Sequence, residues 1–253
     1  DGYVPQGLFY SDKYNTILQT SYNHNDKVSK LYLTNFTSGL FLKELDLLND
    51  DGLENKYHVG GIATNDDKVW ITNDYLVNIY DLEEIMSTNE NSIKSIATVE
   101  IPLRGDFCTF DNNTLWIGDF YLRNIYDVPN DDPKIYGYKL EGISYNDIDY
   151  NNPDYSYSIP KMVQGIVINN DTIYLTHSYT YLINSDLSII NGNLYDSNNN
   201  LNLVDNRKIV KLPPMAEGLF LKDNKLFILF ESNADSYSLA LPKIKKIICI
   251  DIN

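Results

Sequence analysis

The chain has 253 residues, of which 43% are hydrophobic, and a formal net charge of -15 at pH 7. A chain of this length can bury a sizeable core without disulfides or metals. The acidic excess argues against nucleic acid as a partner, because nucleic acid requires a positive field. No run of about 18 apolar residues occurs in the sequence, so no membrane insertion is expected.

Five short glycine-containing segments of similar sequence recur about 46 to 58 residues apart. In chain order they are VPQGLFY, HVGGIAT, GDFCTFD, VQGIVIN and AEGLFLK. After a polar turn, each is followed by a second run rich in β-branched and aromatic residues, such as KVWITN or TIYLTHS. A repeat of this period is typical of solenoids and propellers, and the residue types favour strands throughout.

Each repeat is expected to supply about four strands. In the first repeat these are GLFY, TILQTSY, KLYLTNF and LKELDLL; in the second they are GGIAT, KVWIT, LVNIYDL and IKSIATVEI, with a short helical turn in DLEEIMSTNENS. The sequence therefore predicts a single all-β domain, a five-bladed β-propeller with four-stranded blades. The blades are expected at about 4–48, 57–101, 105–159, 163–212 and 216–253. A β-sandwich or barrel is the alternative.

Closure of the ring is the open point of this prediction. The sequence ends on the third strand of the fifth repeat, so a fourth strand would have to come from the N-terminus, where only Asp1 to Val4 precede the first inner strand. Cys108 and Cys249 lie in apolar runs and are expected to be buried free thiols.

Candidate functional residues gather on one face of the predicted propeller. The loop that leads into each inner strand and the loop between its second and third strands open on the same face, where function is usually placed. Alignment of the repeats puts Gln6, Gly60, Asp106, Gln164 and Glu217 at the start of the inner strands. His58 lies beside them, and the loops add Tyr22, His24, His177, Tyr179, Glu231 and Tyr237. Arg104, just before Asp106, could bind a carboxylate or phosphate.

Three chemistries fit this set, besides a channel filled only with water. Calcium would be held by Asp106 and Glu217 with the amide oxygens of Gln6 and Gln164. A transition metal would be held by His58, His177 and Glu217. Acid–base catalysis without a metal would use Glu217 or Asp106 with His58 or His177.

The segments PQG, HVGGI, TLWIGDF, GYKL, VQG and AEGLFLKDNKLFILFES together resemble a family of secreted bacterial β-propeller proteins, mostly without an assigned function. The resemblance implies an exported propeller, secreted or at the cell surface, and brings no established activity. In architecture alone, the predicted fold is also similar to plant-type glutaminyl cyclases and calcium-dependent apyrases.

Two functions are expected from these observations. The first is a monomeric extracellular binding module that uses the loop-rich face to bind a small molecule, glycan, peptide or surface partner, with a cation in the channel. The alternative is a hydrolase or cyclotransferase-like enzyme with Glu217 and His58 as acid–base residues.

Overall fold

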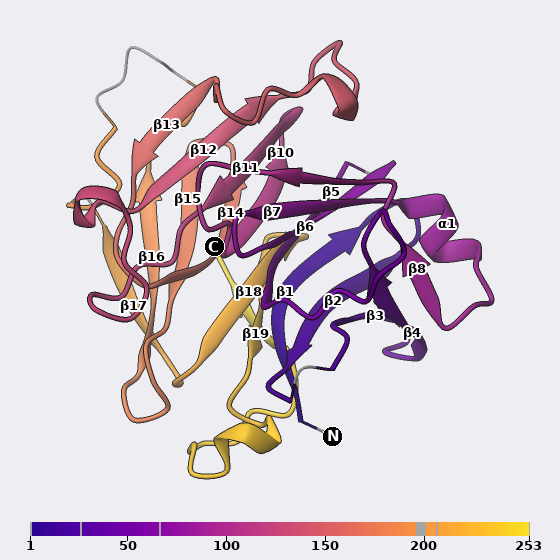
Figure 1. The fold of residues 1–253 in the computed structure, drawn as a ribbon. Coiled ribbons are helices and arrows are strands. Elements are labelled where there is room, and N and C mark those ends of the chain that lie inside the picture. Colours follow the sequence, from indigo (N-terminus) through magenta and orange to yellow (C-terminus); the bar gives the residue numbers. More distant parts are fainter. Residues whose placement is uncertain (1, 26, 66, 196–200, 206, 253) are drawn as a thin grey trace.

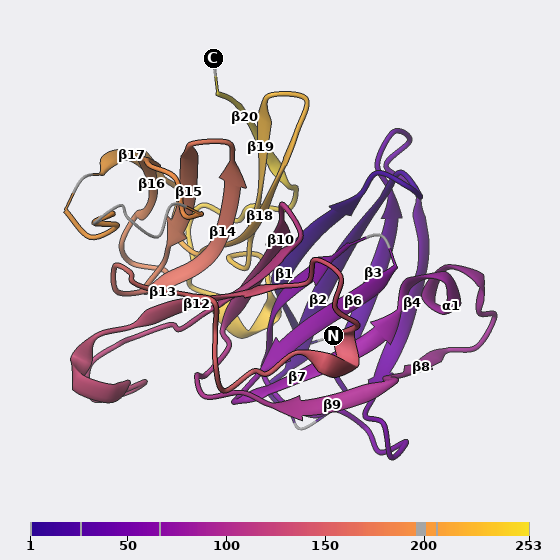
Figure 2. The same cartoon turned by 90° about the horizontal axis from the view of Figure 1, so that it is seen from above.

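The computed structural model describes residues 2–252 except 26, 66, 196–200 and 206. It forms five small sheets in a ring, which confirms the five-bladed β-propeller (Figure 1). The first inner strand of each blade lies nearest the axis, and Figure 2 shows β1, β10, β14 and β18 gathered at the centre. None of the described helices is long and apolar enough to cross a membrane.

The second repeat contributes one strand to the first blade. The first blade contains β1 (Tyr3–Ser11), β2 (Thr16–Asn23), β3 (Lys30–Asn35) and β4 (Phe41–Leu48), and the second contains β5 (Val59–Thr64), β6 (Lys68–Asn73), β7 (Leu76–Asp81) and β9 (Ala97–Glu100). Between β7 and β9 come the expected helical turn, α1 (Leu82–Ser87), and β8 (Ser92–Lys94). The single strand expected over IKSIATVEI is therefore wrong: β8 pairs in parallel with β4 of the first blade, and only β9 completes the second.

The third blade contains β10 (Phe107–Asp111), β11 (Thr114–Gly118), β12 (Lys134–Lys139) and β13 (Tyr155–Ser158), with short 3-10 turns at Pro129–Asp131 and Tyr145–Asp147. The fourth contains β14 (Val163–Asn169), β15 (Thr172–His177), β16 (Ser185–Asn191) and β17 (Lys208–Leu212). The fifth contains β18 (Ala216–Lys222), β19 (Lys225–Phe230) and β20 (Ile248–Asp251), with a 3-10 turn at Asp235–Tyr237. Apart from β8, consecutive strands of a blade pair antiparallel.

Among the described residues, the fifth and first blades meet by packing, without a shared strand. Strand β1 pairs with β2 inside the first blade, and the fifth blade holds three strands among the described residues. The contact between these blades is made by inner strands and aromatic rings, with Tyr10 stacked on Phe220 at 5.7 Å between ring centroids. The N-terminal segment therefore does not supply the fourth strand that the sequence left open.

Buried aromatic residues fill the space between blades. Trp70 and Trp116 are fully buried, and Trp70 stacks on Phe110 of the next blade at 5.8 Å. Cys108 is buried, but Cys249 is exposed, so the prediction for Cys249 is wrong. The reason is its place on the edge strand β20, where successive side chains point to opposite faces.

Glycine at the start of the inner strands is required by how closely these strands approach one another. A Cβ added to Gly60 would lie 2.1 Å from the carbonyl oxygen of Asp106, and one added to Gly7 would lie 2.5 Å from that of Gly60. Gly218 faces Leu8 N at 2.5 Å across the closure. Because these neighbours are backbone atoms, they cannot move aside as a flexible side chain would.

We expect Gly60→Ala to lower the free energy of unfolding by about 1–3 kcal/mol or more, the usual cost of overpacking. Gly142→Ala is the control, because Gly142 has a φ of +71° and no atom within 4 Å of an added Cβ, so only backbone strain is tested. Urea unfolding of both variants measures the difference. A loss below about 1 kcal/mol for Gly60→Ala would show that close approach at the axis is not the constraint.

Candidate functional site

A small pocket opens at the end of the channel where the inner strands begin. Its volume is ≈ 150 Å³. It is lined by Gln6, Tyr22, His58, Arg104, Asp106, Phe120, Leu122, Tyr126, Gln164, Tyr179, Glu231 and Tyr237, which we call the channel-mouth pocket. Nine of these twelve side chains were selected from the sequence. The pocket brings together residues from all five blades.

A local distortion of the inner strands presents the polar side chains. The strand register shifts between Pro5 and Leu8 in β1 and between Val163 and Gly165 in β14, a pattern of β-bulges that re-aim side chains. The shifted stretches contain Gln6 and Gln164, both of which line the pocket. The residue before the repeated glycine is thus turned toward the channel.

Two buried carboxyl groups lie at the fifth blade. Glu217 follows the first residue of β18 and is 1% exposed, and Glu231 follows β19 and is 8% exposed. They are hydrogen-bonded to each other. The amide of Gln164 donates to Glu217 at 3.2 Å, and that of Gln6 donates to Glu231 at 3.0 Å.

Burial controls the protonation of this pair. It raises the pKa of Glu217 well above its ordinary value, and the charge of Glu231 adds to the rise. Burial also raises the pKa of Glu231 to about 8, against the hydrogen bonds from Gln6, Glu217 and Tyr237. Protons are therefore held on this pair at neutral pH, and Glu231 presents a carboxyl group to the pocket.

The opposite wall of the pocket is an ion-paired arginine. Arg104 contacts Asp106 with Nη2 at 3.1 Å and Asp74 at 3.3 Å, and its guanidinium lies 4.8 Å from the ring centroid of Tyr126. The backbone N–H of Phe120 donates to Asp106 at 2.7 Å. Burial raises the pKa of Asp106, while Arg104 and this N–H oppose the rise.

The three histidines have different surroundings. His58 lines the pocket, with its ring centroid 3.9 Å from that of Tyr22. His24 is exposed and bonds the Tyr22 hydroxyl at 3.2 Å. His177 lies outside the pocket, and its Nδ1 is 3.2 Å from the carbonyl oxygen of Lys161. Burial lowers the pKa of His58 and of His177 to about 4, so both rings are neutral at pH 7.

The geometry joins some candidates and separates others. Glu217 meets Glu231, whereas Asp106 is held by Arg104, so the two carboxylates that were expected to share a calcium ion have different partners. Within the described residues no group of three His, Cys, Asp or Glu side chains is placed to hold a metal ion. Calcium with amide ligands stays a prediction, which melting in EDTA and in calcium chloride would check.

The sequence reasoning missed Phe120, Leu122 and Tyr126. All three follow β11, in the loop between the second and third strands of the third blade, which was already assigned to this face. The signal that could have found them is the run FYLRNIY, an apolar and aromatic stretch in a loop of this face. Asp119 helps to fix this loop, because its carboxylate accepts the backbone N–H of Arg104 at 2.8 Å and that of Lys134 at 3.4 Å.

No protein-family model and no curated protein matches this chain. Among solved structures, a glutaminyl cyclase of Myxococcus xanthus has a TM-score of 0.60 at 9% identity, covering 100% of this chain and 93% of that chain. Hydrazine synthase of Kuenenia stuttgartiensis has a TM-score of 0.46 at 8% identity, covering 98% and 74%. BamB of Moraxella catarrhalis has a TM-score of 0.41 at 11% identity, covering 90% and 80%.

The first of these likenesses confirms the expected similarity in architecture to a glutaminyl cyclase. At 9% identity it shows the fold alone, since one propeller fold carries many unrelated functions. The chain is thus a five-bladed β-propeller protein. The similarity to apyrases and the membership of a secreted family stay predictions.

The carboxyl pair predicts an unusual pH dependence of stability. In the unfolded chain glutamate loses its proton near its ordinary pKa of 4.5, whereas Glu231 keeps it to about 8 in the fold. The native state binds more protons across that range, so its contribution to the free energy of unfolding falls as the pH rises. In the unfolded chain the histidines titrate near their ordinary pKa of 6.5. Their contribution is the same in the parent protein and in a variant of the pair, so the difference between the two slopes reports the pair.

We expect Glu217→Gln to lose less stability than the parent protein between pH 6.5 and 8, because the variant lacks one of the two buried carboxyl groups whose pKa the fold raises. Glu100→Gln, which alters an exposed glutamate, serves as the control. Chemical unfolding at several pH values measures the slopes. Identical slopes for the parent and Glu217→Gln would contradict the shared burial of the pair.

Proposed function

We propose that the protein is a binding module whose channel-mouth pocket holds one sugar residue of a neutral glycan. The observation that carries the proposal is a pocket of ≈ 150 Å³ that combines five aromatic side chains with two carboxamides and a carboxyl group. Small-molecule sites typically have this form, apolar and aromatic walls with a few placed polar groups.

The charges favour a neutral ligand. Burial keeps protons on Glu217 and Glu231, and the cation of Arg104 is already paired with Asp106 and Asp74. A charged ligand would have to displace one of these partners. Sugar hydroxyls instead both donate and accept hydrogen bonds, and carboxamide, tyrosine and carboxyl groups can meet both needs.

The aromatic side chains come from four blades and meet at the same face. Tyr22 belongs to β2, Phe120 and Tyr126 follow β11, Tyr179 follows β15, and Tyr237 follows β19. Tyr179 is 52% exposed, so this ring can contact the part of a ligand that extends beyond the pocket. Tyrosine is suited to such a place because it has an apolar body and a polar tip.

The glycan would bind outside the cell if the protein is exported, as the family resemblance implies. Extracellular location and a monomeric state stay part of the proposal. A peptide ligand would need hydrogen bonds from the same few polar groups to its termini or polar side chains. The binding experiment distinguishes a peptide from a glycan.

We expect a neutral monosaccharide from a panel of glucose, galactose, mannose and N-acetylglucosamine to perturb the NMR signals of pocket residues. Gln164→Ala and Tyr237→Ala should each weaken binding about tenfold, because each removes a hydrogen bond or a stacking surface. Tyr145→Ala makes the same truncation far from the pocket and should bind like the parent. If no sugar of the panel perturbs these signals but short peptides do, the ligand of the pocket is a peptide and not a glycan.

A second function is favoured by one observation, the buried carboxyl group of Glu231 in the wall of the pocket, where burial raises its pKa to about 8. Such a group is a general acid poised near neutral pH. It would make the protein a hydrolase or cyclotransferase-like enzyme with Glu231 in place of the expected Glu217 and His58. Glycoside hydrolysis would use Glu231 with a partner other than Glu217, because a catalytic carboxyl pair needs a separation of about 5 Å or more, whereas Glu217 and Glu231 are hydrogen-bonded.

If this enzyme function holds, nitrophenyl glycosides of the bound sugar should be hydrolysed, and Glu231→Gln should lower the rate at least a hundredfold while sugar binding persists. Release of nitrophenol measures the rate of hydrolysis, and Glu100→Gln is the control. If the parent protein binds the sugar but hydrolyses no glycoside, the enzyme function is wrong and the binding function stands.

A further inference from the structure

Among the described residues, no further strand covers the outer edge of the third blade, which is strand β13. Strand β13 is the last strand of its sheet among the described residues, and its sequence, YSYS, contains no charged residue or proline. Natural sheets usually protect such edges with charge, proline or a covering segment. The outer strand of the fourth blade, β17, follows that rule with Lys208 and Lys211.

The backbone of β13 offers hydrogen-bonding groups away from its own sheet. The N–H of Ile159 donates to the carbonyl of Pro133 at 2.9 Å, which turns Ile159 toward the β12 side. Alternation along an antiparallel strand then turns Tyr157 and Tyr155 toward β12 as well. The N–H and C=O groups of Ser156 and Ser158 therefore point outward.

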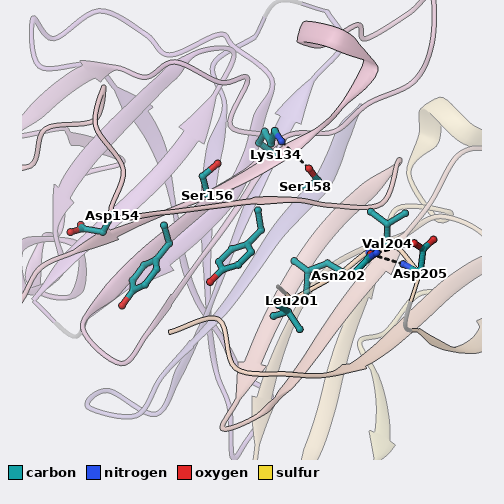
Figure 3. Close-up of a pocket in the computed structure, with 11 residues that line it drawn as sticks. Lys134, Asp154, Ser156, Ser158, Leu201, Asn202, Val204 and Asp205 are labelled. Atoms are coloured by element: carbon teal, nitrogen blue, oxygen red, sulfur yellow. Dashed lines mark hydrogen bonds between the residues drawn. The ribbon is translucent and has the colours of Figure 1, made fainter. Parts of the chain in front are cut away.

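A groove lies along this edge. Its volume is ≈ 710 Å³, and its two sides are β13 and the segment 201–205 of the fourth blade. Figure 3 shows Ser156 and Ser158 on the strand and Leu201, Asn202 and Asp205 on the facing segment. Leu203 of that segment is fully buried, which anchors the facing wall in the fourth blade. The groove is thus open along a free edge and bounded on its other side.

Two carboxylates and one lysine carry the charges that line the groove. Asp154 and Asp205 are both exposed and both line it. Each is held in place: Asp154 accepts the N–H of Lys139 at 2.8 Å, and Asp205 accepts the Asn202 amide at 2.8 Å. The lining cation, Lys134, is already paired with Asp132 at 2.6 Å. The net charge of -15 adds to the attraction for a positively charged partner.

We propose that this groove binds an extended, lysine- or arginine-rich segment of a partner polypeptide, which adds to the third blade as a further strand beside β13. The outward groups of Ser156 and Ser158 supply the main-chain hydrogen bonds, as in other cases of strand addition to a sheet edge. Basic side chains of the segment meet Asp154 and Asp205, and aliphatic side chains between them contact Leu201 and Tyr157. This surface is separate from the channel-mouth pocket and does not depend on the function of that pocket.

Fluorescence anisotropy with a labelled peptide of alternating lysine and valine tests the proposal on the full chain. Ser156→Pro removes the outward N–H but no bond to β12, and it should weaken binding at least tenfold. Ser156→Ala keeps the N–H and should bind like the parent. Asp205→Asn should weaken binding severalfold, and a peptide of alternating glutamate and valine should bind at least tenfold more weakly.

Three results would overturn the proposal. One is no binding of the lysine–valine peptide, and another is equal binding by Ser156→Pro and Ser156→Ala. The third is dimerisation of the free protein that Ser156→Pro abolishes, because a second copy would then occupy the edge. If Ser156→Pro fails to fold, a probe peptide N-methylated at alternate residues replaces it, and unchanged affinity of that probe would overturn strand addition.

Discussion

The close approach of the inner strands at the axis is the constraint on which the rest of this propeller depends. An added Cβ at Gly60 would meet the backbone of Asp106 at 2.1 Å, and one at Gly7 would meet that of Gly60 at 2.5 Å. Threonines of the second strands support the same region: Thr20 donates to the Gly60 carbonyl at 3.1 Å, and Thr176 donates to that of Glu217 at 2.7 Å. Neighbouring blades are thus joined by backbone contacts where larger residues do not fit.

This constraint also creates the pocket. The register shifts that accompany the repeated glycines turn the preceding residues, among them Gln6 and Gln164, toward the channel. A ring of blades thereby offers one variable polar position per repeat at a common opening. The blades keep the same backbone contacts, while the residues at the opening differ from blade to blade and set the chemistry of the pocket.

Burial gives those polar residues properties that they lack in water. The Glu217–Glu231 pair retains protons because a pair of buried negative charges is costly, and the two glutamine amides hold its oxygens in place. Across the pocket, Asp106 is buried with a cation and with a backbone N–H donor. The carboxyl groups of this small opening therefore have different partners: the Glu217–Glu231 pair shares its protons, and Asp106 is paired with Arg104. Neither group leaves an unpaired charge for a ligand, which underlies the choice of a neutral ligand.

Much of the fold and of the pocket lining could be predicted from the sequence. The spacing of the glycine segments and the strand-forming runs determined five blades, the assignment of loops to one face, and nine of the residues that line the pocket. These are properties of a repeat, in which local pattern and register carry the fold. The helical turn at Leu82–Ser87 was likewise encoded locally, since Asp81 caps it by accepting the N–H of Glu84.

Only the tertiary structure decided the rest. The transfer of β8 to the first blade, the exposure of Cys249 and the closure of the ring between β1 and β18 depend on contacts between segments far apart in the chain. So does the choice of partners, with Glu217 bonded to Glu231 rather than placed beside Asp106, and with His177 kept away from the pocket. A repeat specifies which residues reach the common face, but side-chain distances and desolvation decide which of them meet and which keep a proton.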